Sequence, residues 1–182
     1  GVSLVQDGVV TAADLASGAI TASALPAGSV LQVVSTTKTD TFSMTGQTAT
    51  AITGLTATIT PSSTSSEILI IVSIGGYAQG SGQGRFFLTR GGSTISGAIG
   101  DAADSRVRDT FTISGPTSGA PQIVGGTHYL DSPSTTSSTT YGVDVSSNDA
   151  GQAIYINRSV TDSTTQGYQR NVSTITVMEI AG

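Results

Sequence analysis

Short runs of Thr, Val and Ile, separated by clusters of Gly, Ser, Asn and Pro, dominate this chain from Ser29 onward. Side chains that branch at Cβ fit extended strands better than helices, and the separating residue types favour turns. The apolar residues do not recur at the spacing of an amphipathic helix. The sequence therefore predicts an all-β fold with antiparallel strands.

The runs predict roughly nine to eleven strands at short spacing, which favours a two-sheet antiparallel β-sandwich of jelly-roll type over a barrel with a ligand cavity. The expected strands are residues 30–37, 39–45, 48–60, 67–78, 85–90, 93–95, 107–114, 122–130, 139–146, 152–157 and 171–180.

Three of these segments indicate how the sheets are buried. Residues 67–74 are apolar on both faces, so we expect a central strand, covered by the second sheet on one side and by a neighbouring subunit or loop on the other. Residues 53–60 alternate instead, which turns Leu55, Ala57 and Ile59 inward and the threonines outward. Residues 171–180 stay apolar almost to the end, which predicts an interior strand.

The segment before the strands contains a ten-residue repeat, in which Gly8, Gly18 and Gly28 coincide. Each unit has too few large apolar residues to bury a core alone, so we expect a stalk whose apolar residues meet their copies in a homo-oligomer. The alternative is a disordered linker with chance periodicity. Pro26 to Gly28 ends the pattern, which predicts a stalk over residues 1–27 and a head over residues 28–182. The stalk contacts are expected at Val5, Val10, Leu15, Ile20 and Leu25.

Charged residues make up 10% of the chain, against about 25% in an average soluble protein. The net charge of −5 argues against nucleic acid and anionic membranes as partners. The longest apolar run, residues 68–72, is far too short for membrane insertion. Cysteine is absent, which excludes disulfides and thiolate metal sites.

Catalytic motifs are not convincing. The one imidazole is His128, and no serine lies in a nucleophile-elbow motif, so we expect His128 to be an ordinary strand residue beside Tyr129. The glycines of residues 75–84 resemble a phosphate-binding loop, but neither a Lys-Ser/Thr pair nor a helix follows them. The better interpretation of this run is a long hairpin loop.

Three carboxylates, Asp101, Asp104 and Asp109, are interleaved with Arg106 and Arg108. Calcium is one interpretation of this spacing, but the arginines would neutralise the carboxylates, so a salt-bridged turn is predicted instead. Glycosidase carboxylates are usually set in aromatic-rich grooves, and this chain has no Trp. The residues therefore predict a protein that is not an enzyme and uses no cofactor or metal.

Taken together, the chain resembles virion structural proteins of tailed bacteriophages, especially the short fibre-like proteins of marine and cyanobacterial phages. The stretches that carry this resemblance are residues 18–33 (GAITASALPAGSVLQV), 52–55 (ITGL), 59–66 (ITPSSTSS), 100–106 (GDAADSR), 130–133 (LDSP), 139–141 (TTY), 155–159 (YINRS) and 173–180 (STITVMEI).

The resemblance implies a homotrimer in the extracellular virion, on the tail or the capsid surface, with a stalk that anchors to other virion proteins and a head that attaches to a host surface glycan. A stalk of this length reaches at most about 100 Å, which argues against a long tail fibre. Alternatives are a head fibre, a capsid decoration or cement protein with a purely structural role and, more remotely, a glycan-cleaving enzyme.

Two long loops are candidates for meeting such a receptor. Residues 131–139 offer hydroxyl groups without an aromatic ring. Residues 159–170 are the better candidate, because a sugar stacks its apolar face on an aromatic ring and bonds its hydroxyls to carboxylate, amide and guanidinium groups. The alternative is that the aromatic ring of Tyr168 only packs against the head and holds the loop in place. The predicted receptor residues are Asp162, Gln166, Tyr168, Gln169 and Arg170.

Overall fold

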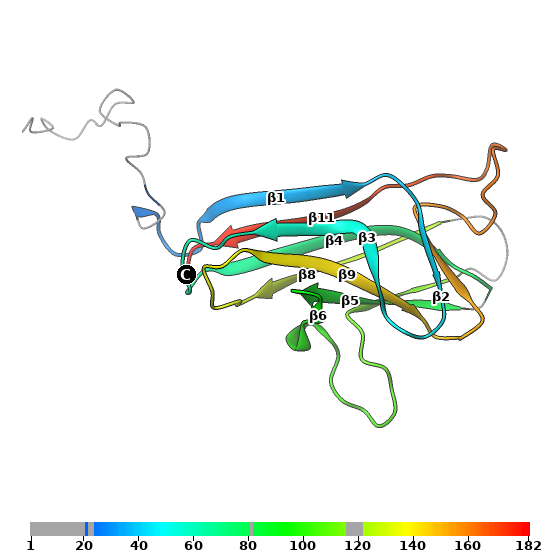
Figure 1. The fold of residues 1–182 in the computed structure, drawn as a ribbon, viewed down its shortest axis with the longest axis horizontal. Coiled ribbons are helices and arrows are strands. Elements are labelled where there is room, and N and C mark those ends of the chain that lie inside the picture. Colours follow the sequence, from blue (N-terminus) through cyan, green and yellow to red (C-terminus); the bar gives the residue numbers. More distant parts are fainter. Residues whose placement is uncertain (1–20, 22–23, 81, 116–121) are drawn as a thin grey trace, which may run out of the picture.

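A computed structural model of the chain describes residues 21, 24–80, 82–115 and 122–182. The described residues form two antiparallel β-sheets packed face to face, which confirms the expected all-β sandwich (Figure 1). Their elements are β1 (Val30–Lys38), β2 (Phe42–Thr45), β3 (Thr50–Ile59), β4 (Glu67–Ala78), β5 (Gln83–Arg90), β6 (Ser93–Thr94), the 3₁₀-helix η3 (Ser96–Ala98), β7 (Phe111–Ser114), β8 (Ile123–Asp131), β9 (Thr139–Ser147), β10 (Ala153–Ile156) and β11 (Ser173–Ile180).

Within the described residues, the first sheet, here sheet A, has six strands in the order β1-β11-β4-β10-β2, with β8 also paired to β4. The second, sheet B, has five strands in the order β3-β9-β5-β6, with β7 also paired to β5. Two predicted strands begin too early. Strand β2 starts at Phe42, after a turn in which Lys38 forms an ion pair with Asp40, and β7 starts at Phe111, after an exposed loop.

The core lies between the sheets. Strand β4 is central in sheet A and buries Ile68, Ile70, Val72 and Ile74 against sheet B. The predicted inward residues of β3, namely Leu55, Ala57 and Ile59, are buried as expected. Strand β11 lies between β1 and β4, which confirms that the last strand is interior. The expected cover over the other face of β4 stays a prediction.

The glycine-rich run is not a long hairpin loop, as the sequence suggested. Strands β4 and β5 lie in different sheets, so the chain crosses between the sheets through a short turn after Ala78. Several of the glycines lie inside strands, where neighbours leave no room for a side chain. A Cβ at Gly75 would lie 2.6 Å from the Cβ of Asn171, and one at Gly84 would lie 3.1 Å from the Phe86 ring. Tight packing therefore explains these glycines better than loop flexibility does.

Strands β10 and β11 run along the same side of β4. Strand β10 pairs with Gly76–Ala78 and β11 with Glu67–Ser73, both antiparallel to β4. After β10 the chain leaves sheet A, and it returns as β11 to pair with the neighbouring part of β4. We call the connecting segment, residues 157–172, the distal loop.

The sandwich has two distinct ends. At one end, the Gly28 amide donates to the Ala181 carbonyl and the Ala181 amide donates to the Ser29 carbonyl, so the start of β1 and the C-terminus lie together. The distal loop lies at the opposite end (Figure 1). In the described part of the chain, no helix is long and apolar enough to cross a membrane.

Candidate functional site

The distal loop is held by a cluster of charges. Asp162 accepts hydrogen bonds from Arg170 Nη2 at 2.7 and 2.9 Å and from Arg158 Nη1 at 3.3 Å. The Arg158 guanidinium also lies over the Tyr155 ring, 4.4 Å from its centre. Arg158 and Arg170 face each other across a β-bridge, so the carboxylate of Asp162 offsets the repulsion between two like charges.

Both stems of the distal loop meet at a buried polar group, Asn157. Its Nδ2 donates to the carbonyls of Lys38 and Asp40 at 2.8 and 2.9 Å, and its Oδ1 accepts from Ser173 Oγ at 2.7 Å. Ser173 Oγ in turn accepts from the Gly75 amide at 3.2 Å. Asn157 has a φ of 60°, a left-handed conformation that Asn tolerates better than most residues. One side chain therefore joins β1, the end of β10 and the start of β11.

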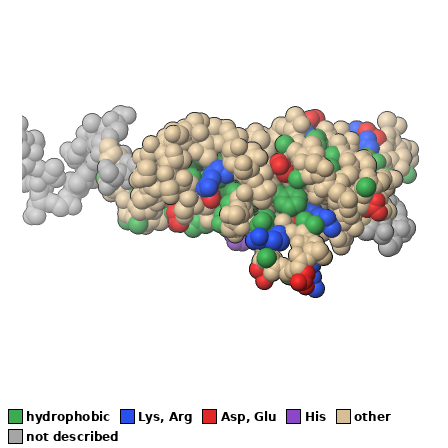
Figure 2. Space-filling view, turned by 60° about the horizontal axis from the view of Figure 1, so that its bottom comes forward, with side chains coloured by type: hydrophobic (Ala, Val, Ile, Leu, Met, Phe, Trp, Pro, Cys, Tyr) green, Lys and Arg blue, Asp and Glu red, His purple; other side chains and the backbone are tan. Residues whose placement is uncertain are grey.

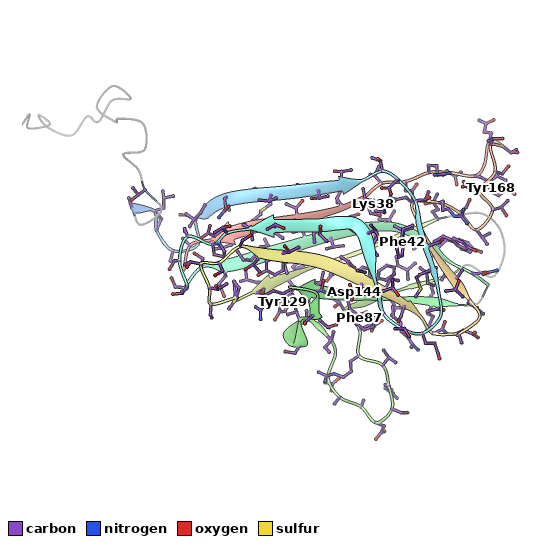
Figure 3. All side chains as sticks on the ribbon, viewed as in Figure 1. Lys38, Phe42, Phe87, Tyr129, Asp144 and Tyr168 are labelled. Carbon is purple, nitrogen blue, oxygen red and sulfur yellow. The ribbon has the colours of Figure 1, made fainter. Side chains whose placement is uncertain are left out.

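All five predicted receptor residues lie exposed on the distal loop. The structure joins Asp162 and Arg170, which bind each other. Three hollows in the described part of the chain have none of the five residues in their walls. Tyr168 is 37% exposed and lies at the outer end of the loop (Figure 3), so its ring is available rather than fully packed.

The predicted stalk contacts fall mostly outside the described residues, where Val5, Val10, Leu15 and Ile20 lie. Leu25 is described, and its side chain is exposed at the end of the head that carries the C-terminus. With Leu31 and Ala181, it lines a hollow of about 480 Å³. The oligomeric stalk stays a prediction.

The outer face of sheet A carries an apolar row that we did not predict from the sequence. Val33 pairs with Met178, Met178 with Leu69, and Leu69 with Leu130, so four apolar side chains line up across β1, β11, β4 and β8. Val33 is 54% exposed, and Leu130 is exposed as well. Ile71 extends the row, and it too is exposed. The two-faced apolar pattern of β4 was the one signal of this surface in the sequence.

Two groups with acid–base potential, His128 and Glu179, have well-defined surroundings in the structure. His128 is an exposed residue of β8 opposite Ile71, which confirms that it is a strand residue beside Tyr129. Glu179 is fully buried, and its carboxylate accepts from Gln32 Nε2 and from both the amide and the hydroxyl of Ser62, each at 2.6 Å. Burial alone would raise the pKa of Glu179, but the hydrogen bonds from Ser62 and Gln32 outweigh it and lower the pKa. The Glu179 carboxylate therefore has a structural role, in which it links β11 to Gln32 of β1 and to Ser62.

The predicted salt-bridged turn at residues 101–109 is wrong. Neither Arg106 nor Arg108 forms an ion pair with a described carboxylate. Instead, Arg108 Nε donates to the Gly100 carbonyl at 2.5 Å, and Asp109 accepts from the Thr112 hydroxyl. The loop projects from the sandwich, with its charges at the tip (Figure 2), and at such exposed positions ion pairs gain little over hydration.

Comparison with known proteins adds no family to these observations: no protein-family model matches the chain, and no curated protein matches it either.

Proposed function

We propose that this chain is a non-enzymatic virion fibre protein of a tailed bacteriophage, with a trimeric stalk, a jelly-roll-like head and a role in attachment to a host surface glycan. The observation that carries the proposal is that the head has two different ends. The start of β1, which follows the predicted stalk, lies at one end, and the exposed distal loop lies at the other. A fibre needs this arrangement, because its anchor and its contact with the host must lie at opposite ends.

The outer face of sheet A supports self-association. The apolar row from Val33 to Leu130 is continuous across four strands, unlike the singly scattered apolar residues of an ordinary surface. Identical copies can meet on it without like-charge repulsion, because the pairs that make up the row contain no charged residue. Trimeric symmetry is part of the proposal through the resemblance to fibre proteins.

Imaging of phage particles that carry this protein with an electron-dense label tests the proposal. A single group of labels on the tail supports attachment. Many regularly spaced labels on the capsid would instead support the alternative, a decoration protein with a purely structural role, and would contradict the fibre assignment.

The oligomeric state is tested separately by light scattering at micromolar concentration. We expect the mass of a trimer for the full chain, and weaker assembly after deletion of residues 1–27. A monomer under these conditions would contradict the proposed stalk. A trimer that survives the deletion unchanged would assign assembly to the head alone.

A further inference from the structure

A second surface of the head has the features of a ligand site. Between strand β8 at the edge of sheet A and β6 with η3 at the edge of sheet B lies a hollow of about 380 Å³. Its walls are Arg90, residues 93–97 and residues 129–132. We call it the edge hollow. Its volume falls in the range of small-molecule sites.

Hydrogen bonds to a buried carboxylate fix the position of Arg90 in this hollow. Its Nη1 donates to both carboxylate oxygens of Asp131, at 3.0 and 2.8 Å, and the Tyr141 hydroxyl donates to Asp131 Oδ2 at 2.7 Å. The Tyr141 side chain is fully buried, that of Asp131 is 5% exposed and that of Arg90 is 40% exposed. The two buried residues, Tyr141 and Asp131, therefore hold the Arg90 guanidinium at the surface in one orientation.

The guanidinium keeps unused donors. Arg90 Nε and Nη2 have no hydrogen-bond partner among the described residues. Ion pairs with a partner this exposed contribute little to stability, so stability alone is a poor explanation for the Arg90–Asp131 pair in a chain with so few charges. Orienting two free N–H groups toward a ligand explains it better, because a fixed donor loses little entropy on binding.

The other walls identify the ligand class. Ser93, Thr94 and Ser96 are exposed and offer hydroxyl groups. Tyr129, shown in Figure 3, points inward from β8, and η3 packs so closely on it that a Cβ at Gly97 would lie 2.3 Å from its hydroxyl. Hydroxyls and an aromatic ring beside a fixed guanidinium match a sugar, which has both hydroxyls and an apolar face.

The charge of the hollow favours a neutral sugar. Asp131 already balances Arg90, and the chain carries a net charge of −5, so a carboxylate on the ligand would meet a second negative charge across one guanidinium. We propose that the edge hollow binds a neutral hexopyranose unit of a glycan, with two adjacent sugar hydroxyls accepting hydrogen bonds from Arg90 Nε and Nη2. The inference rests on the attachment role proposed above for its biological meaning.

Saturation-transfer NMR with the full chain tests the inference. The probes are the methyl glycosides of glucose, mannose and galactose, with methyl glucuronide as the charged comparison, at concentrations up to about 50 mM, since ligands of this size bind in the millimolar range. We expect a saturable signal from at least one neutral glycoside. No signal from any of the three would overturn the proposal, and so would a signal from methyl glucuronide alone.

Two variants locate the binding. Ser96→Trp fills the edge hollow from an exposed position, and we expect at least a tenfold loss of affinity. Ser105→Trp adds the same side chain at an exposed serine outside the hollow and should bind as the wild type does. Arg90→Lys keeps a charge beside Asp131 but removes the two free N–H groups, so it too should weaken binding about tenfold. Unchanged binding by Ser96→Trp and Arg90→Lys would overturn the assignment to this hollow.

Failure of this inference can be told apart from failure of the attachment role. If no neutral glycoside binds the protein in the NMR experiment but beads coated with the protein adsorb to host cells, the edge hollow is refuted and the attachment role stands. If the sugars bind but the coated beads do not adsorb, the hollow stands and the attachment role is refuted.

Discussion

Replacement of Asn157 should loosen the distal loop more than any single change on its surface. The side chain is fully buried and makes three hydrogen bonds, to the Lys38 and Asp40 carbonyls and to the Ser173 hydroxyl. These bonds connect the two stems of the loop to β1. In Asn157→Ala all three are lost, and the partner groups on Lys38 and Ser173 stay in buried residues, whereas Asp40 is exposed.

The expected magnitude follows from these contacts. A net loss of about 1 kcal/mol for each hydrogen bond gives about 3 kcal/mol. Asn157 also has a φ of 60°, and an alanine held in that left-handed conformation adds strain of about 1 kcal/mol. The free energy of unfolding should therefore fall by about 4 kcal/mol in Asn157→Ala. In a chain of this size that corresponds to a melting temperature lower by about 10 °C.

Thermal unfolding at matched protein concentration measures the effect, since the melting temperature of an oligomer depends on concentration. Asn157→Gly is the informative companion, because glycine loses the same hydrogen bonds but accepts the positive φ, and it should be about 1 kcal/mol more stable than the alanine variant. Asn148→Ala is the matched control. It removes one exposed bond, to the Gln83 amide, and should cost no more than about 1 kcal/mol. If Asn157→Gly were as stable as the wild type, the reasoning would be refuted.

Three further changes test other parts of the structure. Glu179→Gln should reduce the acid sensitivity of the melting temperature: the pKa of Glu179 is lowered from 4.5 in the folded state, so its stabilisation is complete above about pH 4.5 and is lost as the pH falls through the folded pKa. Ile71→Glu places a charge beside the apolar row and should lower the mass measured by light scattering, whereas Thr58→Glu on the exposed face of β3 should not. Tyr168→Ala should reduce adsorption of protein-coated beads to host cells at an unchanged melting temperature, and unchanged adsorption would remove the distal loop as a receptor site.

The strands could be predicted from the sequence because local patterns determine them. The alternation in residues 53–60 follows from the two-residue period of a strand, and Leu55, Ala57 and Ile59 are buried as that period requires. The interior position of β11 followed from apolar residues on both of its faces. Errors occurred where a local pattern has several structural causes. Glycines favour loops, but Gly75 makes room for Asn171 of the distal loop and Gly84 makes room for Ile154 of β10.

The sites depend on contacts between distant residues, which a single sequence does not reveal. Asn157 and its partner Lys38 are 119 residues apart in the sequence, and Arg90 and its partner Asp131 are 41 residues apart. The sequence grouped Asp162 and Arg170 correctly because they belong to one loop. It missed the apolar row, since Val33, Met178, Leu69 and Leu130 become neighbours through strand register alone. The error at Arg106 and Arg108 has a related cause, because proximity in sequence does not make exposed charges pair.

The distal loop and the edge hollow are too far apart to form a single site, and this makes their roles separable. Asp131 in the hollow pairs with Ile68 of β4, whereas the Asn157 amide at the root of the distal loop donates to the Gly75 carbonyl. Seven residues of strand separate these two points on β4, or roughly 23 Å, which is several times the width of one sugar ring. Sites this far apart with no shared partner contribute independently. If both bind glycans, the losses of adsorption free energy in Tyr168→Ala and Ser96→Trp should therefore add in the double variant. A double variant no worse than one of the single variants would show that one surface alone carries attachment.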